Sequence, residues 1–241
     1  MQILNDILLK FKISFNFLTK QKWGILKPND PHSIPKYLLK KYLINKPIII
    51  DCGAHIGSDS IELAKIFPKS EVYSFEPVPY LYEKLQHLTR TYKNIKTFNC
   101  ALSNTDGDAV FYLSSGASDA SSSLLEPNEH LKTHPDVNFN EKIIVKTFKL
   151  DTWALNNNIT KVDFLWLDMQ GFELDMLKAS TKIFPTVKLI HTEVSIKESY
   201  KNSVLYSEYK EWLFTKGFHV VLEAIPENTD MGNVLFEKKQ N

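Results

Sequence analysis

The feature of this sequence that most constrains its fold is the alternation of apolar, strand-like runs with helix-like segments from residue 47 onward. The runs "PIIID", "EVYSFE", "VDFLWLD" and "VKLIHTEV" are nearly continuous in apolar residues, which is typical of strands buried on both faces. Each is followed by a segment with helical spacing, such as "SDSIELAKIF" after the first. This pattern predicts an α/β fold, a mostly parallel sheet with helices on both faces. Ligands of such sheets bind outside the carboxyl ends of the strands, so functional residues are expected directly after the strands.

The length of 241 residues predicts one large domain, residues 46–241, with an N-terminal helical extension over residues 1–45. Apolar residues in the extension recur at helical spacing, but Asp6, Lys10 and Lys12 interrupt them. We therefore expect neither a signal peptide nor a transmembrane segment. The extension is expected to pack on the domain, to shape the substrate pocket or to contact a second subunit in a homodimer. A helix lying on a membrane surface is the alternative.

Charge and cysteine content narrow the classes of partner. The 29 basic and 28 acidic residues leave a net charge of +1, so no global basic field is available and no long nucleic acid is expected as a partner. Only Cys52 and Cys100 are present, both in apolar runs. A disulfide framework is not expected, and a reducing cytoplasm is the predicted location.

One long stretch, residues 114–142, is rich in Ser, Asp, Asn and Pro, and it predicts a lid loop over the site or a disordered segment. It follows "SNTDG", which predicts a tight turn that joins "IKTFNCAL" to "DAVFYL" in a hairpin. The serines at 121–123 lack the surroundings of a hydrolase nucleophile. His130 and His134 have a spacing that suits a metal on a helix, but no glutamate adjoins them, and we attribute the spacing to chance.

The turn after the first strand, "DCGAHIG", predicts a nucleoside cofactor by elimination. Its Asp51-to-Gly57 pattern lacks the third glycine of a dinucleotide site and the lysine of a P-loop. S-adenosylmethionine remains, because it carries a cationic amino-acid end and a ribose but no phosphate. Asp51 is expected to face the amino-acid end, directly or through water, and Gly53 to let the backbone approach. Glu76, which closes the second strand, is expected to accept hydrogen bonds from both ribose hydroxyls.

On these and later segments the sequence resembles the FkbM family of S-adenosylmethionine-dependent methyltransferases. The matching pieces are "IIIDCGAHIGSDS", "VYSFEPVP", "NCALSNTDGDAVFYLS", "SSSLLEP", "VKTFKLDTW", "VDFLWLDMQGFELDML" and "HTEVS". The resemblance implies a class I methyltransferase, Rossmann-like fold: a seven-stranded, mostly parallel sheet with one antiparallel strand near its C-terminal edge. It also implies methylation of hydroxyl groups on natural products and glycans. The family usually has a glutamate where this chain has Gln170, which puts a base or metal role there in doubt.

Carboxylates at the ends of the fourth and fifth strands are the predicted catalytic groups. A sugar hydroxyl is a poor nucleophile, so a general base is expected to assist it. Asp168 and Glu193 could orient or deprotonate the acceptor, or hold a divalent cation such as Mg²⁺. His191, two residues before Glu193 on the same sheet face, is the third candidate. Lys197 and Tyr200 could contact an anionic substrate, although a solvated pair is the simpler interpretation.

The remaining predicted cofactor contacts surround the same turn and the neighbouring strand ends. His55 is expected to contribute backbone contacts, with a side-chain contact to the methionine carboxylate as an option. Asp59 is a cofactor contact or a helix-capping residue. Ala101 is expected near the adenine. The full predicted cofactor set is Asp51, Gly53, His55, Gly57, Asp59, Glu76, Ala101, Asp168 and Gln170, with metal ligands left unknown.

The sequence thus predicts an O-methyltransferase that uses S-adenosylmethionine and acts on a sugar, a glycan precursor or a related hydroxylated small molecule. Two alternatives stay open. One is an N- or nucleic-acid methyltransferase on the same fold, although "DMQGF" lacks the Asn/Asp-Pro-Pro-Tyr/Phe signature of amino-methylating DNA enzymes. The other is a non-catalytic protein that keeps the nucleoside site.

Overall fold

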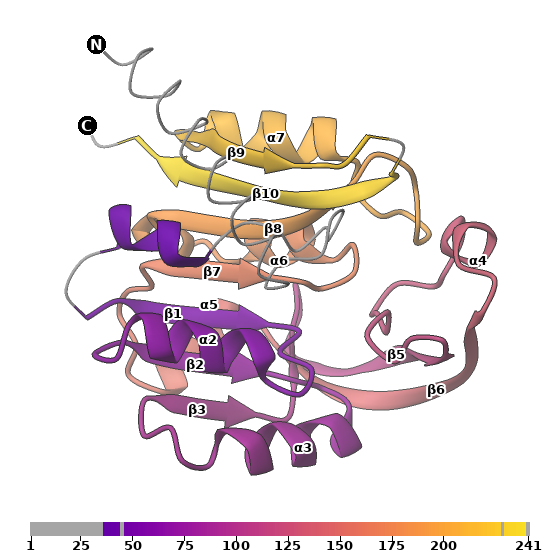
Figure 1. Ribbon diagram of the computed structural model, residues 1–241, viewed down its shortest axis with the longest axis horizontal. Coiled ribbons are helices and arrows are strands. Elements are labelled where there is room, and N and C mark those ends of the chain that lie inside the picture. The colour runs from indigo at the N-terminus through magenta and orange to yellow at the C-terminus, as the bar shows by residue number, and fades with distance from the viewer. Residues whose placement is uncertain (1–35, 44–45, 228, 240–241) are drawn as a thin grey trace, which may run out of the picture.

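The computed structural model describes residues 36–43, 46–227 and 229–239. Its centre is a seven-stranded sheet, and the runs predicted as buried strands form its middle (Figure 1). One strand, β10, runs antiparallel to both of its neighbours, next to the C-terminal edge. The predicted class I arrangement is therefore confirmed. The strand order is β3 (Ile95–Phe98), β2 (Glu71–Phe75), β1 (Ile48–Cys52), β7 (Phe164–Leu167), β8 (Leu189–Ser195), β10 (Met231–Lys238) and β9 (Phe218–Ala224).

Helices cover both faces of this sheet, as the continuous apolar strands require. One face packs against α2 (Ser58–Ile66) and the 3₁₀ helix η1 (Lys36–Lys41), with α3 (Pro79–Thr89) beside α2. The other face packs against α5 (Leu150–Asn156), α6 (Glu173–Ala179) and α7 (Tyr206–Thr215). A short 3₁₀ turn, η2 (Phe184–Thr186), precedes β8.

The N-terminal extension lies outside the described residues except for its last part. There η1 packs against α2, and Leu39 and Leu43 are buried in the core on that face. Among the described residues, no helix has the length and apolar character to cross a bilayer.

A second, three-stranded sheet was not predicted. It consists of β4 (Ala101–Leu102), β6 (Val137–Phe148) and β5 (Gly107–Gly116), with β6 in the middle. Together with α4 (His130–Thr133) it forms a lobe beyond the carboxyl ends of the parallel strands (Figure 1). Val78, Leu81, Ala101, Phe111 and Val145 form a small apolar core between the lobe and the main body.

Two local predictions are wrong in this region. The run "IKTFNCAL" is not one strand, because the side chain of Asn99 donates to the backbone oxygens of Glu76 and Pro77 (2.9 and 3.1 Å) at the point where the chain leaves β3. The turn at residues 103–107 therefore does not close a hairpin, and β5 pairs with β6 instead. Much of the expected loop 114–142 is ordered as the end of β5, α4 and the start of β6, which leaves residues 117–129 as its main irregular part.

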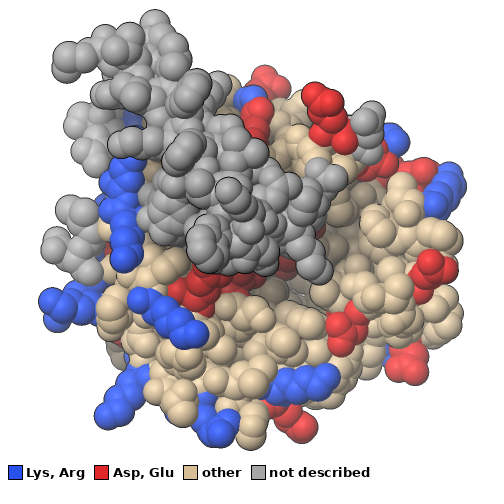
Figure 2. All heavy atoms as spheres, in the orientation of Figure 1, with Lys and Arg blue, Asp and Glu red and all other residues tan. Residues whose placement is uncertain are grey.

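Figure 2 shows this face of the molecule, with a hollow between the main body and the lobe. On the described part of this face, basic and acidic side chains are scattered and do not merge into one basic patch. This distribution agrees with the near-neutral net charge of the sequence.

Candidate active site

The turn after β1 is the tightest part of the site. The backbone N–H groups of Gly53 and Ala54 both donate to the Phe75 carbonyl oxygen, at 3.1 and 2.9 Å. Gly53 has a φ of +79°, and a Cβ added to it would lie 1.9 Å from the Asp168 carbonyl oxygen. The turns after β1 and β7 therefore touch through their backbones, and only glycine fits between them.

Glu76, directly after β2, has a buried carboxylate that contacts the turn after β1. Its two oxygens accept hydrogen bonds from the backbone N–H groups of His55 (2.9 Å) and Val78 (2.8 Å). Burial raises the pKa of Glu76 to about 8, although these two hydrogen bonds act in the opposite direction. The side chain is thus held rigidly and is mostly protonated at neutral pH when nothing else contacts it.

A cavity opens where these turns meet, and its chemistry fits S-adenosylmethionine. Apolar side chains suit a flat adenine ring, and Ala101 lies among them. Glu76 can pair with a ribose diol, and Gly53 with Asp168 forms the polar end. The apolar wall consists of Phe75, Val78, Leu81, Ala101, Leu102, Phe111 and Leu124.

Part of the long irregular segment closes this cavity. Asp119, Ala120, Ser122 and Leu124 line it, and His55 Nε2 lies 2.9 Å from Asp119 Oδ1. The enclosed space is about 80 Å³, whereas sites for drug-sized ligands usually hold roughly 300 Å³ or more. A nucleoside cofactor therefore does not fit this space with the segment in this position. Asp119 was missed by the sequence analysis, because nothing in a Ser- and Asp-rich stretch marks one acid for contact with His55.

Three residues of the predicted cofactor set do not line the cavity. Asp51 is buried, and its carboxylate accepts a hydrogen bond from the Ser60 hydroxyl of α2, which in turn contacts Ser74 at 2.6 Å. Gly57 faces α3, since a Cβ there would meet Leu85 at 2.6 Å. Asp59 lies in the first turn of α2, where an acid stabilises the helix dipole. Strand alternation turns the Asp51 side chain toward α2, so it does not reach the cavity directly.

The opposite wall of the cavity is a hydrogen-bonded group of side chains after β7 and β8. The amide nitrogen of Gln170 donates to Asp168 Oδ1 at 2.6 Å and to Glu193 Oε2 at 2.9 Å. Its carbonyl oxygen accepts a hydrogen bond from the Tyr200 hydroxyl at 2.9 Å. Gln170 adopts a φ of +53°, which aims its side chain between the two carboxylates. Asp168 and Gln170 line the cofactor cavity, whereas Glu193 does not.

Glu193 lies on a smaller second cavity, of about 30 Å³, which Gln170 also lines. Burial raises the pKa of Glu193, and the nearby charges of Asp168 and Glu173 raise it further. Glu173 has a pKa raised to about 7 by burial, and it accepts hydrogen bonds from the backbone N–H groups of Met169 and Gly171. Three acids therefore crowd the ends of β7 and β8, and the charge of one opposes the ionisation of its neighbours.

His191, the third predicted catalytic residue, does not reach either cavity. Its ring is 1% exposed and is stacked on Trp166, with centroids 3.5 Å apart. Its side chain is on the same sheet face as that of Glu193. It lies two residues earlier in β8, however, where it is paired with Trp166 of β7. Its place is in the core.

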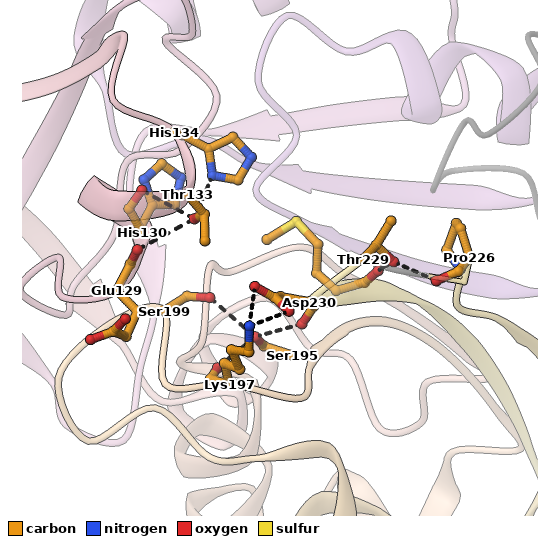
Figure 3. Close-up of polar contacts among 11 residues, drawn as sticks. Glu129, His130, Thr133, His134, Ser195, Lys197, Ser199, Pro226, Thr229 and Asp230 are labelled. Atoms are coloured by element: carbon orange, nitrogen blue, oxygen red, sulfur yellow. Dashed lines mark hydrogen bonds and ion pairs between the residues drawn. The ribbon is translucent and has the colours of Figure 1, made fainter.

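The loop after β8 separates the two residues that the sequence analysis paired there. Tyr200 is buried and its hydroxyl contacts the Ser121 carbonyl oxygen at 2.7 Å as well as Gln170, so the solvated interpretation is wrong for it. Lys197 instead pairs with Asp230 at 2.9 Å (Figure 3). In the same view Thr133 contacts His134 Nδ1 at 2.9 Å.

His130 and His134 do not form a metal centre with their surroundings. Their rings stack on each other with centroids 4.7 Å apart. Within the described part of the chain, no group of three or more metal-ligating side chains comes together.

Comparisons with known proteins agree with this geometry. The family model described as "Methyltransferase FkbM domain" matches residues 51–220. The chain is 28% identical to the 2-O-methyltransferase NoeI of Sinorhizobium fredii (strain NBRC 101917 / NGR234) over 75% of this chain and 76% of that protein. It is 23% identical to the methyltransferase sdnD of Sordaria araneosa, over 83% and 84% of the two chains. The structure of an rRNA methylase from Streptococcus thermophilus superposes with a TM-score of 0.52 and 14% identity, over 89% of this chain and all of that one, which shows a shared fold.

Proposed function

The chain belongs to the FkbM family and is an S-adenosylmethionine-dependent methyltransferase, and we propose that its acceptor is a hydroxyl group of a sugar, a glycan precursor or a related small molecule. One observation carries the proposal: Asp168 lines the cofactor cavity, and its backbone carbonyl oxygen lies against the Gly53 turn, so an acid stands at the polar end of the cavity, where the acceptor would approach the methyl group. The relative NoeI, described as a 2-O-methyltransferase, supports oxygen as the accepting atom.

The cofactor side of the site is assigned to four residues. Glu76 would accept hydrogen bonds from the ribose hydroxyls, and Ala101 would lie against the adenine. The backbone at Gly53 and His55 would face the amino-acid end. When bound, S-adenosylmethionine supplies a methyl group on a positively charged sulfur, which is a good leaving group.

The acceptor side is assigned to Asp168 with Gln170 as its positioning residue. Methyl transfer forms an oxygen–carbon bond as the sulfur–carbon bond breaks, and the hydroxyl proton must leave the oxygen. Asp168 accepts that proton, and its carboxylate is held by the 2.6 Å hydrogen bond from the Gln170 amide. General-base assistance of this kind contributes roughly 10²- to 10⁴-fold in rate. Residues 119–124, of which Asp119, Ala120, Ser122 and Leu124 line the cavity, act as the lid that excludes water from the transfer.

The cellular setting is also part of the proposal. Cys52 and Cys100 are both free and buried, which suits a reducing cytoplasm. The role of residues 1–45, in the substrate pocket or in a homodimer, stays a prediction.

The proposal is tested in two steps with the purified full chain. Calorimetric titration with S-adenosylhomocysteine, repeated with NAD, is expected to show micromolar binding of the first and none of the second. Methyl transfer from labelled S-adenosylmethionine is then measured on a panel of glycosides, amines and oligonucleotides, with and without Mg²⁺.

Asp168→Asn is the matched variant for these assays. It is expected to lower turnover by roughly 10²- to 10⁴-fold while the affinity for S-adenosylhomocysteine stays nearly unchanged. Labelling of amines or oligonucleotides but of no hydroxylated compound would instead identify an N- or nucleic-acid methyltransferase. Cofactor binding with no labelled product from any acceptor would favour a non-catalytic binding protein.

A further inference from the structure

Two acids at neighbouring strand ends, Asp168 after β7 and Glu193 in β8, form an arrangement in which a divalent cation is often held. Such a cation binds carboxylate oxygens at roughly 2.0–2.6 Å and needs several oxygen ligands directed at one point. A methyltransferase could use a cation there to lower the pKa of the acceptor hydroxyl. In this chain a side chain occupies the space between the two carboxylates.

The amide group of Gln170 lies there. Its nitrogen donates to Asp168 Oδ1 at 2.6 Å and to Glu193 Oε2 at 2.9 Å, so both of its hydrogens are used. The orientation of the amide follows from the surrounding groups. Its oxygen lies 2.9 Å from the Tyr200 hydroxyl, whose single hydrogen is shared with the Ser121 carbonyl oxygen at 2.7 Å, and the flipped amide would set that oxygen against the Asp168 carboxylate.

The third acid in this region is also occupied by other hydrogen bonds. The Glu173 Oε1 atom accepts from the backbone N–H groups of Met169 at 2.8 Å and of Gly171 at 3.4 Å. The amide nitrogen cannot ligate a metal, and the amide oxygen, which could, is directed at the Tyr200 hydroxyl, so Gln170 in this orientation adds no ligand to the pair.

We infer that the Gln170 amide takes the place of a divalent cation between Asp168 and Glu193, so that methyl transfer by this protein requires no metal. The amide bridges the two carboxylates through hydrogen bonds, as a cation would bridge them through coordination, but it carries no charge. Gln170 is thereby a positioning residue that fixes the Asp168 carboxylate. This inference rests on the proposed role of Asp168 as the base.

The direct test measures Mn²⁺ binding and does not depend on finding the acceptor. Wild-type protein with bound S-adenosylhomocysteine is titrated with MnCl₂ and followed by electron paramagnetic resonance. No saturable binding is expected below millimolar Mn²⁺. Gln170→Glu turns the bridge into a third carboxylate and is expected to bind Mn²⁺ at least about tenfold more tightly. The double variant with Asp168→Asn is expected to lose that gain.

Gln86→Glu is the matched control, because it makes the same change at an exposed position on α3, where the amide donates to the Tyr82 hydroxyl. If Gln170→Glu gains no more Mn²⁺ affinity than this control, the amide does not occupy a cation position and the inference fails. It fails equally if wild-type protein binds Mn²⁺ at micromolar concentrations and loses this binding with Asp168→Asn. Should Gln170→Glu not fold, the wild-type titration alone decides.

A second readout uses the proposed activity. Wild-type turnover is expected to change less than about twofold when EDTA or millimolar Mg²⁺ is added. Loss of turnover in EDTA, restored by Mg²⁺, would overturn the inference while leaving the proposed function intact. Absence of turnover on every acceptor would count against the proposed function, and the Mn²⁺ titration would still decide the inference.

Discussion

The two walls of the catalytic cavity are built from different parts of the chain. On the cofactor wall, backbone groups set the geometry: Gly53 packs against the Asp168 carbonyl oxygen, and two backbone N–H groups hold Glu76. On the acceptor wall, side chains set it, through the contacts of Gln170 with Asp168, Glu193 and Tyr200. A change on the first wall is therefore expected to weaken cofactor binding, at Gly53 by disturbing the fold, whereas a change on the second can alter the chemistry alone.

The largest effect is expected from Gly53→Ala, which tests the backbone contact on the cofactor wall. The added Cβ would overlap the Asp168 carbonyl oxygen, and alanine is strained at a φ of +79°. The free energy of unfolding is expected to fall by roughly 3–5 kcal/mol, with loss of S-adenosylhomocysteine binding. Urea denaturation and calorimetry measure the two effects.

Gly217→Ala is the control for that variant. Gly217 has a similar φ of +84°, but nothing lies within 4 Å of an added Cβ. Gly217→Ala is expected to lower the free energy of unfolding by only about 1–2 kcal/mol and to leave cofactor binding unchanged. Equal losses of unfolding free energy in the two variants would show that the close approach of the turns after β1 and β7 does not contribute to stability.

A smaller effect is expected from pH, and it tests Glu76 as the ribose contact. In the free protein burial raises its pKa to about 8, so the carboxyl is protonated below that pH. Ribose hydroxyls donate to the ionised form, and bound cofactor therefore lowers this pKa. At low pH the Glu76 carboxyl must lose its proton before it can accept from the ribose, and this costs binding free energy. At high pH the carboxyl is already ionised, so the affinity for S-adenosylhomocysteine is expected to rise roughly tenfold between about pH 6.5 and pH 9.

Glu76→Gln is expected to weaken binding and to remove this pH dependence. Glu71→Gln, at the exposed start of the same strand, is expected to leave both the affinity and its pH dependence as in the wild type. A Glu76→Gln variant that binds as tightly as wild type at about pH 9 would rule out the ribose assignment.

The smallest effect is expected from Tyr200→Phe, which removes one hydrogen bond on the acceptor wall. The hydroxyl contacts the carbonyl oxygens of Gln170 and Ser121, and its loss is expected to raise the activation free energy by about 1 kcal/mol. The kcat is expected to fall roughly fivefold, with the affinity for S-adenosylhomocysteine unchanged.

Tyr82→Phe, whose hydroxyl makes a long contact at the surface of α3, is the matched control and is expected to behave as wild type. A loss of cofactor affinity in Tyr200→Phe as large as its loss of kcat would contradict the division between the two walls.

Features that depend on neighbouring residues were predictable from the sequence. The continuous apolar runs predicted β1, β2, β7 and β8, and the order of runs and helices predicted their parallel sheet. Acids and glycines directly after those strands then identified Gly53, Glu76 and Asp168, all of which line the cavity. The position and the end of each strand depend on residues that are close together in the sequence, so they can be predicted from the sequence alone.

Features that depend on the meeting of distant segments were not predictable in this way. The β4–β6–β5 sheet pairs residues that lie between 21 (Gly116 with Val137) and 46 (Ala101 with Thr147) positions apart, and nothing in their composition selects that pairing over a hairpin. The contact of Asp119 with His55 spans 64 residues, and that of Gln170 with Tyr200 spans 30.

The sequence by itself thus determined the fold class and the strand ends at which the site lies, because periodicity and turn chemistry act over a few residues. Only the tertiary structure decided which side chains face that site. It turned Asp51 toward α2, stacked His191 on Trp166 and aimed Gln170 between two carboxylates. Those outcomes follow from strand register and from packing against α2 and the loop after β8, which a linear pattern does not contain.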